Sequence, residues 1–152
     1  PRRLVRRLMA AVSRRKGANG ERAVVNFALI HGVDARRVIR TADQHHPDEG
    51  DVHLHDGQVV VQVKAGKKAQ GAAGAVLAAW WTDTQAQARR VGGIPVLVVQ
   101  ARGVPASKPA DWDAHLYLAD LLPDAGIPPR MRVRIRYADI IQLLTGGTND
   151  QD

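Results

Sequence analysis

The sequence feature that most constrains the fold is a β-hairpin pattern centred on Asp56-Gly57. Residues of alternating character flank this dipeptide on both sides, which predicts two antiparallel strands joined by a two-residue type I′ turn. Once the two loop residues are assigned, the register of the whole hairpin is set. That register places Asp51 directly opposite Gln62.

The predicted hairpin has two chemically different faces. We expect its apolar face to pack against the rest of the protein and its polar face to carry chemistry. Directly opposed side chains have Cβ atoms roughly 5 Å apart, so the Asp51 carboxylate and the Gln62 amide oxygen are placed to share a cation. The apolar face holds Val52, Leu54, Val59, Val61 and Val63, and the polar face holds Asp51, His53, His55, Gln58, Gln62 and Lys64.

A helix is predicted before the hairpin. Asn19 is suited to cap its N-terminus, apolar residues recur at helical spacing after it, and Gly32 suits its end. Glu21 lies three and seven residues before Val24 and Ala28 and shares their inward face. An acid in such a position needs a partner.

The remaining patterns predict a mixed α/β domain. The unbroken apolar run from Ile94 to Gln100 is typical of a central strand buried on both faces. The Ala-rich stretch from Ala69 to Val91 is typical of a helix. Around these we expect a loop at 41–50, a Pro-containing loop at 103–109, a weak strand at 115–118, a strand at 132–137 with its arginines on one face, and a final helix at 138–144.

Size and composition limit the classes of protein. The 152 residues, 45% of them hydrophobic, fit one domain, which we place at 17–145 between a basic N-terminal arm at 1–16 and a mobile tail at 146–152. The absence of cysteine excludes disulfides and thiolate chemistry and fits a cytoplasmic protein. No apolar run is long enough to span a membrane, and the first residues lack the apolar core of a secretory signal.

The charge balance favours a polyanionic partner. Lys and Arg number 22 against 15 acids, for a formal net charge of +7. Such a balance favours nucleic acid through counterion release, with a solubilising surface charge as the alternative. The N-terminal arm has apolar residues at helical spacing between its arginines, so it is either a phosphate-contacting helix or a frayed terminus.

Three short motifs resemble those of the PD-(D/E)xK nuclease superfamily. With the order helix, strand, hairpin strand, helix, strand, they are most similar to the archaeal-type Holliday junction resolvases and their phage relatives. The resemblance spans roughly the first half of the chain. It rests on Arg14-Arg15-Lys16-Gly17 with Glu21, on Gly50-Asp51 and on Gln62-Val63-Lys64.

This resemblance implies a fold, an activity and partners. It implies an α/β, restriction-endonuclease-like core of order αβββαβ, with a mixed central sheet flanked by helices. It also implies Mg²⁺-dependent hydrolysis of DNA phosphodiester bonds, for which Mn²⁺ substitutes. A homodimer that acts on branched DNA, as a junction resolvase in recombination, and a bacterial, archaeal or phage origin are expected with it.

The resemblance further implies roles for individual residues. The metal site maps to Glu21, Asp51, Gln62 and the backbone carbonyl of Val63, and the catalytic lysine maps to Lys64. Hard divalent cations prefer such oxygen ligands, and a lysine can orient the attacking water or stabilise the oxyanion that forms on phosphorus. The residues expected to guide DNA phosphates are Arg14, Arg15, Lys16, Lys67 and Lys68.

Gln62 departs from the family pattern, in which most members have Glu or Asp. A glutamine offers a carbonyl oxygen but no charge, so metal affinity should be weaker. Mrr-type restriction nucleases are similar in carrying Gln before x-Lys, which is compatible with activity. The alternative is a catalytically silent nucleic-acid-binding protein that retains the nuclease fold.

Other interpretations remain open. The site residues can be ordinary strand and helix residues, and the charge alone also fits a structural protein of a ribonucleoprotein particle. Trp80 and Trp81 suit core or dimer packing, or stacking on bases. The histidines form either a metal site or a substrate-facing surface, and they are His45, His46, His53 and His55.

Overall fold

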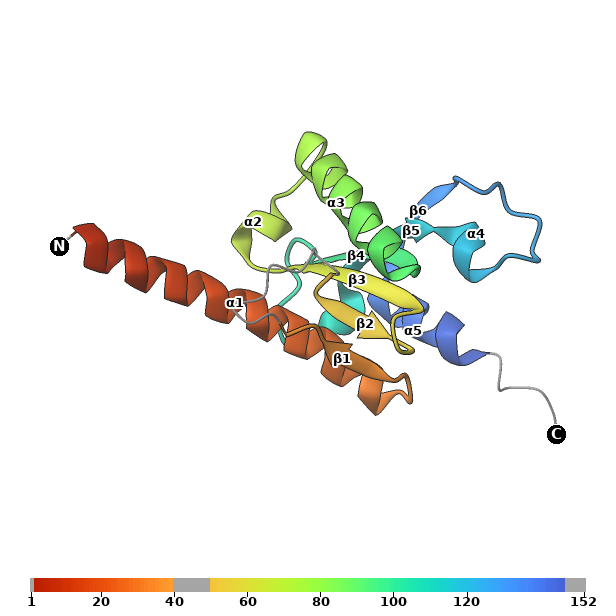
Figure 1. Cartoon of the computed structure of the whole chain (residues 1–152), viewed down its shortest axis with the longest axis horizontal. Coiled ribbons are helices and arrows are strands. Elements are labelled where there is room, and N and C mark those ends of the chain that lie inside the picture. The colour runs from red at the N-terminus through yellow and green to blue at the C-terminus, as the bar shows by residue number, and fades with distance from the viewer. Residues whose placement is uncertain (1, 40–49, 147–152) are drawn as a thin grey trace.

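The computed structural model describes residues 2–39 and 50–146 (Figure 1). Twelve elements follow one another along these residues. In chain order they are α1 (Arg2–Ile30), β1 (Ala35–Arg37), β2 (Val52–Leu54), β3 (Val59–Lys64), α2 (Lys67–Gln70), α3 (Ala75–Val91), β4 (Ile94–Val99), the 3₁₀ helix η1 (Pro109–Asp111), β5 (Asp113–Tyr117), α4 (Leu118–Leu121), β6 (Arg132–Arg136) and α5 (Tyr137–Thr145).

The six strands form one mixed sheet in the order β1-β2-β3-β4-β5-β6. Strands β3 and β4 are parallel, because α3 carries the chain back across the sheet between them. The other neighbouring pairs are antiparallel. The central position expected for the apolar run at 94–100 is confirmed, since β4 lies inside the sheet and its last four residues are buried.

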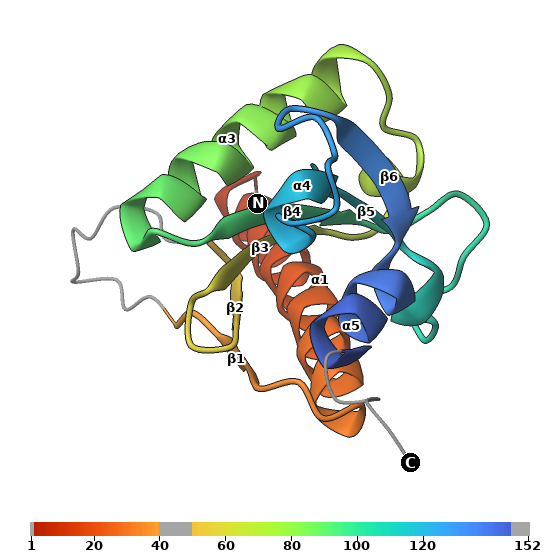
Figure 2. The same cartoon turned by 90° about the vertical axis from the view of Figure 1, so that its right-hand side faces the viewer.

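Helices cover both faces of this sheet (Figure 2). On one face α1 and α5 pack side by side, and their buried residues form a core with β2, β3, β4 and β5. On the other face α3 lies over β3 and β4, where Trp81 packs beside Leu97 and Val99. The protein is therefore a mixed α/β protein with a sheet between two helical layers, as the sequence predicted.

The hairpin register matches the expectation. Val52 pairs with Val61 and Leu54 pairs with Val59, as expected. Asp51 lies just outside these pairs, and its backbone N–H donates to the carbonyl of Val61. At the tip, Asp56 and Gly57 have φ angles of 56° and 86°, the positive values that a type I′ turn requires. The turn is closed by the backbone N–H of Gln58, which donates to the carbonyl of His55.

The first helix differs from its prediction. The expected start of a helix capped by Asn19 is wrong, because α1 is one continuous helix of 29 residues. Asn19 lies inside it and accepts a hydrogen bond from Arg22 instead of capping a terminus. The end near Gly32 is confirmed. The N-terminal half projects beyond the sheet, so its apolar residues Leu4 and Leu8 are exposed (Figure 1).

The helix expected from Ala69 to Val91 is interrupted. The short helix α2 ends at Gln70, and α3 begins only at Ala75. Gly74 has a φ of 51°, a backbone conformation that an uninterrupted right-handed helix does not contain. The single helix predicted from the alanine content was therefore wrong at its N-terminal end, although its C-terminus at Val91 is confirmed.

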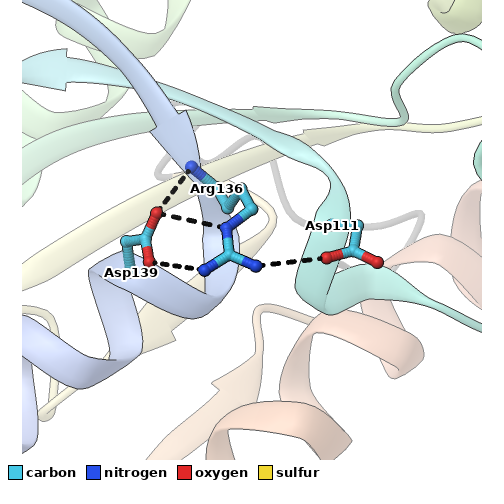
Figure 3. Close-up of polar contacts among 3 residues, drawn as sticks. All are labelled: Asp111, Arg136 and Asp139. Carbon is cyan, nitrogen blue, oxygen red and sulfur yellow. Dashed lines mark hydrogen bonds and ion pairs between the residues drawn. The ribbon is translucent and has the colours of Figure 1, made fainter.

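The C-terminal third adds two strands and a helix to the sheet edge. The strands expected near 115–118 and 132–137 are β5 and β6, and the arginines of β6 are exposed as predicted. Arg136, the last residue of β6, binds Asp139 of α5 with an Nη2–Oδ1 distance of 3.1 Å and Asp111 of η1 with an Nη1–Oδ1 distance of 3.6 Å (Figure 3). These pairs join the end of the strand to both elements. Of the expected loop at 41–50 and tail at 146–152, all but Gly50 and Gly146 lie outside the described residues.

Candidate active site at the end of the hairpin

Asp51 lies where β2 diverges from β3. Its backbone N–H donates to Val61 and its carbonyl accepts from Val38 of the preceding segment, with N···O distances of 3.0 and 2.9 Å. Its carboxylate accepts a hydrogen bond from the backbone N–H of Val63 over 2.9 Å. Because β2 begins only at Val52, this carboxylate binds the N–H of β3 just beyond the paired residues. The side chain thus stands at the end of the hairpin.

Gln62 is buried, a property that the alternating strand pattern left open. The helix α3 covers this face, and the Gln62 side chain is only 5% exposed. An alternating strand pattern does not show whether a second layer will cover the polar side, so this burial was not predicted. His53, on the same face, is likewise buried, at 3% exposure.

The Gln62 amide is anchored to Thr84 of α3. The Thr84 Oγ1 lies 2.7 Å from Gln62 Oε1 and also 2.7 Å from the carbonyl oxygen of Trp80. One hydroxyl proton serves one of these acceptors at a time. When Thr84 donates to Trp80, a rotated Gln62 amide can donate its NH₂ to Thr84 and turn its oxygen away. That second arrangement is the one in which Gln62 can offer an oxygen ligand.

Lys64 is the last residue of β3 and shares the face of Gln62. It is half-buried, and its Nζ lies 5.3 Å from the centroid of the Trp80 ring. The ring holds the ammonium group by a cation–π interaction at this edge of the sheet. Trp80 therefore contacts the candidate catalytic lysine, while Trp81 packs edge-on against Tyr117 in the core expected for it.

Glu21 has a partner that the sequence did not indicate. Its Oε2 accepts a hydrogen bond from Arg37 Nε of β1 at 2.9 Å, and the two side chains are 19% and 28% exposed. The preceding Gly20 brings α1 against the end of β3, where an added Cβ would lie 2.8 Å from the Cβ of Ala65. The need of an inward-facing acid for a partner is thus confirmed.

The structure therefore places the predicted residues around β3, on both sides of the sheet. Glu21 reaches it from α1, Asp51 from the hairpin edge, and Gln62 and Lys64 from the face beneath α3. Sequence reasoning missed Arg37 and Thr84. Thr84 lies three residues after Trp81, a spacing that places both on the inward side of α3, and this was its one available signal.

The predicted phosphate-contacting residues fall in two groups. Lys67 and Lys68 are exposed in α2, directly after the candidate site. The segment that carries Arg14, Arg15 and Lys16 is helical, but the side chains of these residues lie outside the described part of the structure.

The histidines do not form a metal cluster in the described residues. His53 Nδ1 lies 3.1 Å from Arg36 Nη2, and since a guanidinium only donates, this ring nitrogen accepts. His55 lies in the hairpin turn, and His45 and His46 are outside the described residues. Within residues 2–39 and 50–146, no three His, Cys, Asp or Glu side chains are grouped to hold a metal ion.

The chain matches no model of a known protein family and no curated protein. Among the described helices, none is both long enough and apolar enough to cross a membrane. The fold is that of a mixed α/β protein. The proposed function rests on the candidate site alone.

Proposed function

We propose that the protein is a metal-dependent DNA endonuclease of the PD-(D/E)xK type, selective for branched DNA in the manner of a Holliday junction resolvase. The observation that carries this proposal is the hydrogen bond from the Val63 N–H to the Asp51 carboxylate, which places this carboxylate at the backbone between Gln62 and Lys64. The order of α1, three antiparallel strands, a helical crossover and the parallel strand β4 supports a restriction-endonuclease-like core.

The chemistry of the donor set fits Mg²⁺ or Mn²⁺. The groups that would hold the cation are the carboxylates of Glu21 and Asp51, the Gln62 amide oxygen and the Val63 carbonyl, all of them oxygen donors. A bound cation would supply an acidified water and neutralise charge at the phosphate. Arg37 now provides the positive charge beside Glu21, so Glu21 must exchange an ion pair for the cation.

The remaining residues have supporting roles in this proposal. Lys64, held over Trp80, follows the residue whose N–H binds Asp51, and it would orient the attacking water or stabilise the oxyanion. Lys67 and Lys68 of α2, with Arg14, Arg15 and Lys16 of α1, contact the DNA backbone, and their charge contributes to binding in proportion to the phosphates neutralised.

The test is cleavage of labelled four-way junction, flap and linear duplex DNA in Mg²⁺, in Mn²⁺ and in EDTA. The decisive variant is Lys64→Ala, and Lys108→Ala, which removes an exposed lysine from the 103–109 loop, is its matched control. We expect paired nicks in the junction, lost in EDTA and reduced by about two to three orders of magnitude in Lys64→Ala. DNA binding in EDTA should be nearly unchanged.

Each other result has a definite meaning. Cleavage of all three DNAs would keep the nuclease and remove the preference for branched substrates. Equal loss of cleavage and binding in Lys64→Ala would show that the lysine acts in binding only. Cleavage that persists in EDTA would refute the metal-dependent reaction.

A second candidate function, a silent nucleic-acid-binding protein, is favoured by one observation. Gln62 is neutral, buried and anchored to Thr84, and Glu21 is already neutralised by Arg37, so the arrangement is complete without a cation. This candidate predicts salt-dependent DNA binding with no cleavage in either metal. A cut that disappears both in EDTA and in Asp51→Ala would exclude it.

A further inference from the structure

A polar pocket lies on the α3 face of the sheet, away from the candidate active site. It has a volume of about 290 Å³ and is enclosed between the α2–α3 connection and strands β4, β5 and β6. Residues 71–73 form part of its lining. The polar and charged side chains that line it are Gln70, Gln100, Arg102, Asp113, His115 and Arg134.

The two arginines of this pocket are available to a ligand. Arg102 and Arg134 are both exposed, and neither forms a hydrogen bond or ion pair with another side chain in the described part of the chain. Arg136, two residues further along β6, differs because Asp139 and Asp111 already bind it (Figure 3). Among the described residues that line the pocket, Asp113 alone is acidic, so positive charge exceeds negative charge.

His115 also lines this pocket and is half-buried. Its pKa is lowered chiefly by burial, Asp113 opposes this shift, and Arg132 and Arg134 reinforce it. A neighbouring anion would offset the arginines and favour the protonated ring. The pKa of His115 should therefore rise when an anion binds in this pocket.

The strand register relates the position of the pocket to that of the candidate active site. Gln62, Leu97, His115 and Arg134 are successive register partners on β3, β4, β5 and β6, so Arg134 lies three strand spacings, about 14 Å, from Gln62. A second pocket of about 270 Å³ shares Gln70 and Gln100 with the first. It extends to Gly20 and Lys67, the neighbours of Glu21 and of the end of β3.

We infer that this pocket binds a phosphate of the nucleic-acid backbone through Arg102 and Arg134, an inference that rests on the proposed DNA substrate. Planar guanidinium groups match phosphate oxygens in paired hydrogen bonds. At an axial rise of 3.4 Å per nucleotide of one strand, a separation of about 14 Å along the DNA axis corresponds to about four nucleotides from the phosphate that is cut. The two adjoining pockets mark the path of that strand over the α2–α3 connection.

The experiment measures binding of a labelled four-way junction in EDTA over a range of salt concentrations. The variants are Arg134→Ala and the double variant Arg102→Ala/Arg134→Ala. The control is Arg89→Ala, which removes an exposed arginine at the opposite end of α3. We expect the slope of log K against log salt to fall by about 0.9 for each arginine that contacts phosphate, which corresponds to about eightfold weaker binding at 0.1 M salt.

A second readout uses His115 and no cleavage. In the wild-type protein, NMR titration of the His115 ring, assigned by its loss in His115→Gln, should show a higher pKa with a short DNA duplex than without it. In Arg134→Ala this increase should shrink, because the phosphate is held less firmly. The melting temperature of each variant, expected to match the wild type for these exposed positions, confirms that it is folded.

The outcomes separate this inference from the proposed nuclease activity. If the salt slopes of the Arg134 variants equal that of Arg89→Ala and DNA leaves the His115 pKa unchanged, the pocket does not bind phosphate, even if the junction is cut. Reduced slopes without cleavage in any metal would support phosphate binding in the pocket and contradict the proposed nuclease activity. A protein that does not bind DNA at all would overturn both.

Discussion

The carboxylate of Asp51 and the backbone N–H of Val63 form a 2.9 Å hydrogen bond at the point where β2 leaves β3. This bond gives Asp51 two roles that can be separated. The side chain satisfies a half-buried donor of the sheet, and it places a negative charge at the backbone between Gln62 and Lys64. A structural role needs only the oxygen acceptor, whereas the proposed metal site needs the charge.

Asp51→Asn and Asp51→Ala should therefore differ in stability but not in activity. Asparagine can still accept from Val63, so its free energy of unfolding should stay close to that of the wild type, while alanine leaves the N–H unpaired and should cost about 1–3 kcal/mol. Both should lose cleavage by about two to three orders of magnitude. Urea unfolding and junction cleavage check this, and an Asn variant that cuts normally would contradict the metal role.

Arg37→Gln should raise the apparent affinity for Mg²⁺. Its guanidinium now binds Glu21, and the cation must displace it. Removing a partly exposed pair worth about 1 kcal/mol should lower the half-saturating Mg²⁺ concentration for cleavage about fivefold. Arg36→Gln is the matched control, because Arg36 contacts His53 and not Glu21. If both variants respond alike to Mg²⁺, Glu21 is not a ligand.

Gln62→Glu should make folding stability depend on the metal. A carboxylate at this 5% exposed position is costly in EDTA, so the melting temperature should fall, and Mg²⁺ should restore it. Gln100 is another 5% exposed glutamine, and it accepts a hydrogen bond from the Gly66 N–H. The melting temperature of Gln100→Glu should fall as well, and Mg²⁺ should not restore it. Thermal unfolding with Mg²⁺ and with EDTA measures this. Recovery in neither variant would favour the silent protein.

The part of the site that the sequence predicted is the part controlled by local turn geometry. Asp56-Gly57 determines the hairpin register, and this register brings Asp51 to the end of the paired residues of β3. The buried central strand β4 was equally predictable, because a short apolar run with β-branched residues is typical of a strand covered on both faces.

The part that the sequence did not predict depends on tertiary contacts. The burial of Gln62 requires α3 to lie over β3, and the pairing of Glu21 requires β1 to bring Arg37 beside α1. Neither contact leaves a periodic signal. The continuation of α1 through Gly17-Ala18-Asn19-Gly20 also overrides poor local helix propensity, because Gly20 lets the helix approach Ala65 at the end of β3.

The pairing of α1 with α5 leads to a last prediction, on alkaline stability. The buried Tyr137 hydroxyl donates to the Val24 carbonyl at 2.8 Å, and burial raises the pKa of Tyr137 well above its usual value near 10. A raised folded-state pKa contributes stability that is complete below the unfolded pKa and is lost as the pH rises above it. The wild-type free energy of unfolding should therefore decline above about pH 10.

Tyr137→Phe should be less stable than the wild type by about 1 kcal/mol at pH 7, since it leaves the Val24 carbonyl without this donor. Its stability should also fall less steeply above pH 10, because the ionising group is gone. Tyr117→Phe, which removes a hydroxyl bound by Gln85, should keep the wild-type steepness. Urea unfolding from pH 7 to 11 measures both effects, and parallel alkaline curves for wild type and Tyr137→Phe would show that Tyr137 does not link α1 and α5 in this way.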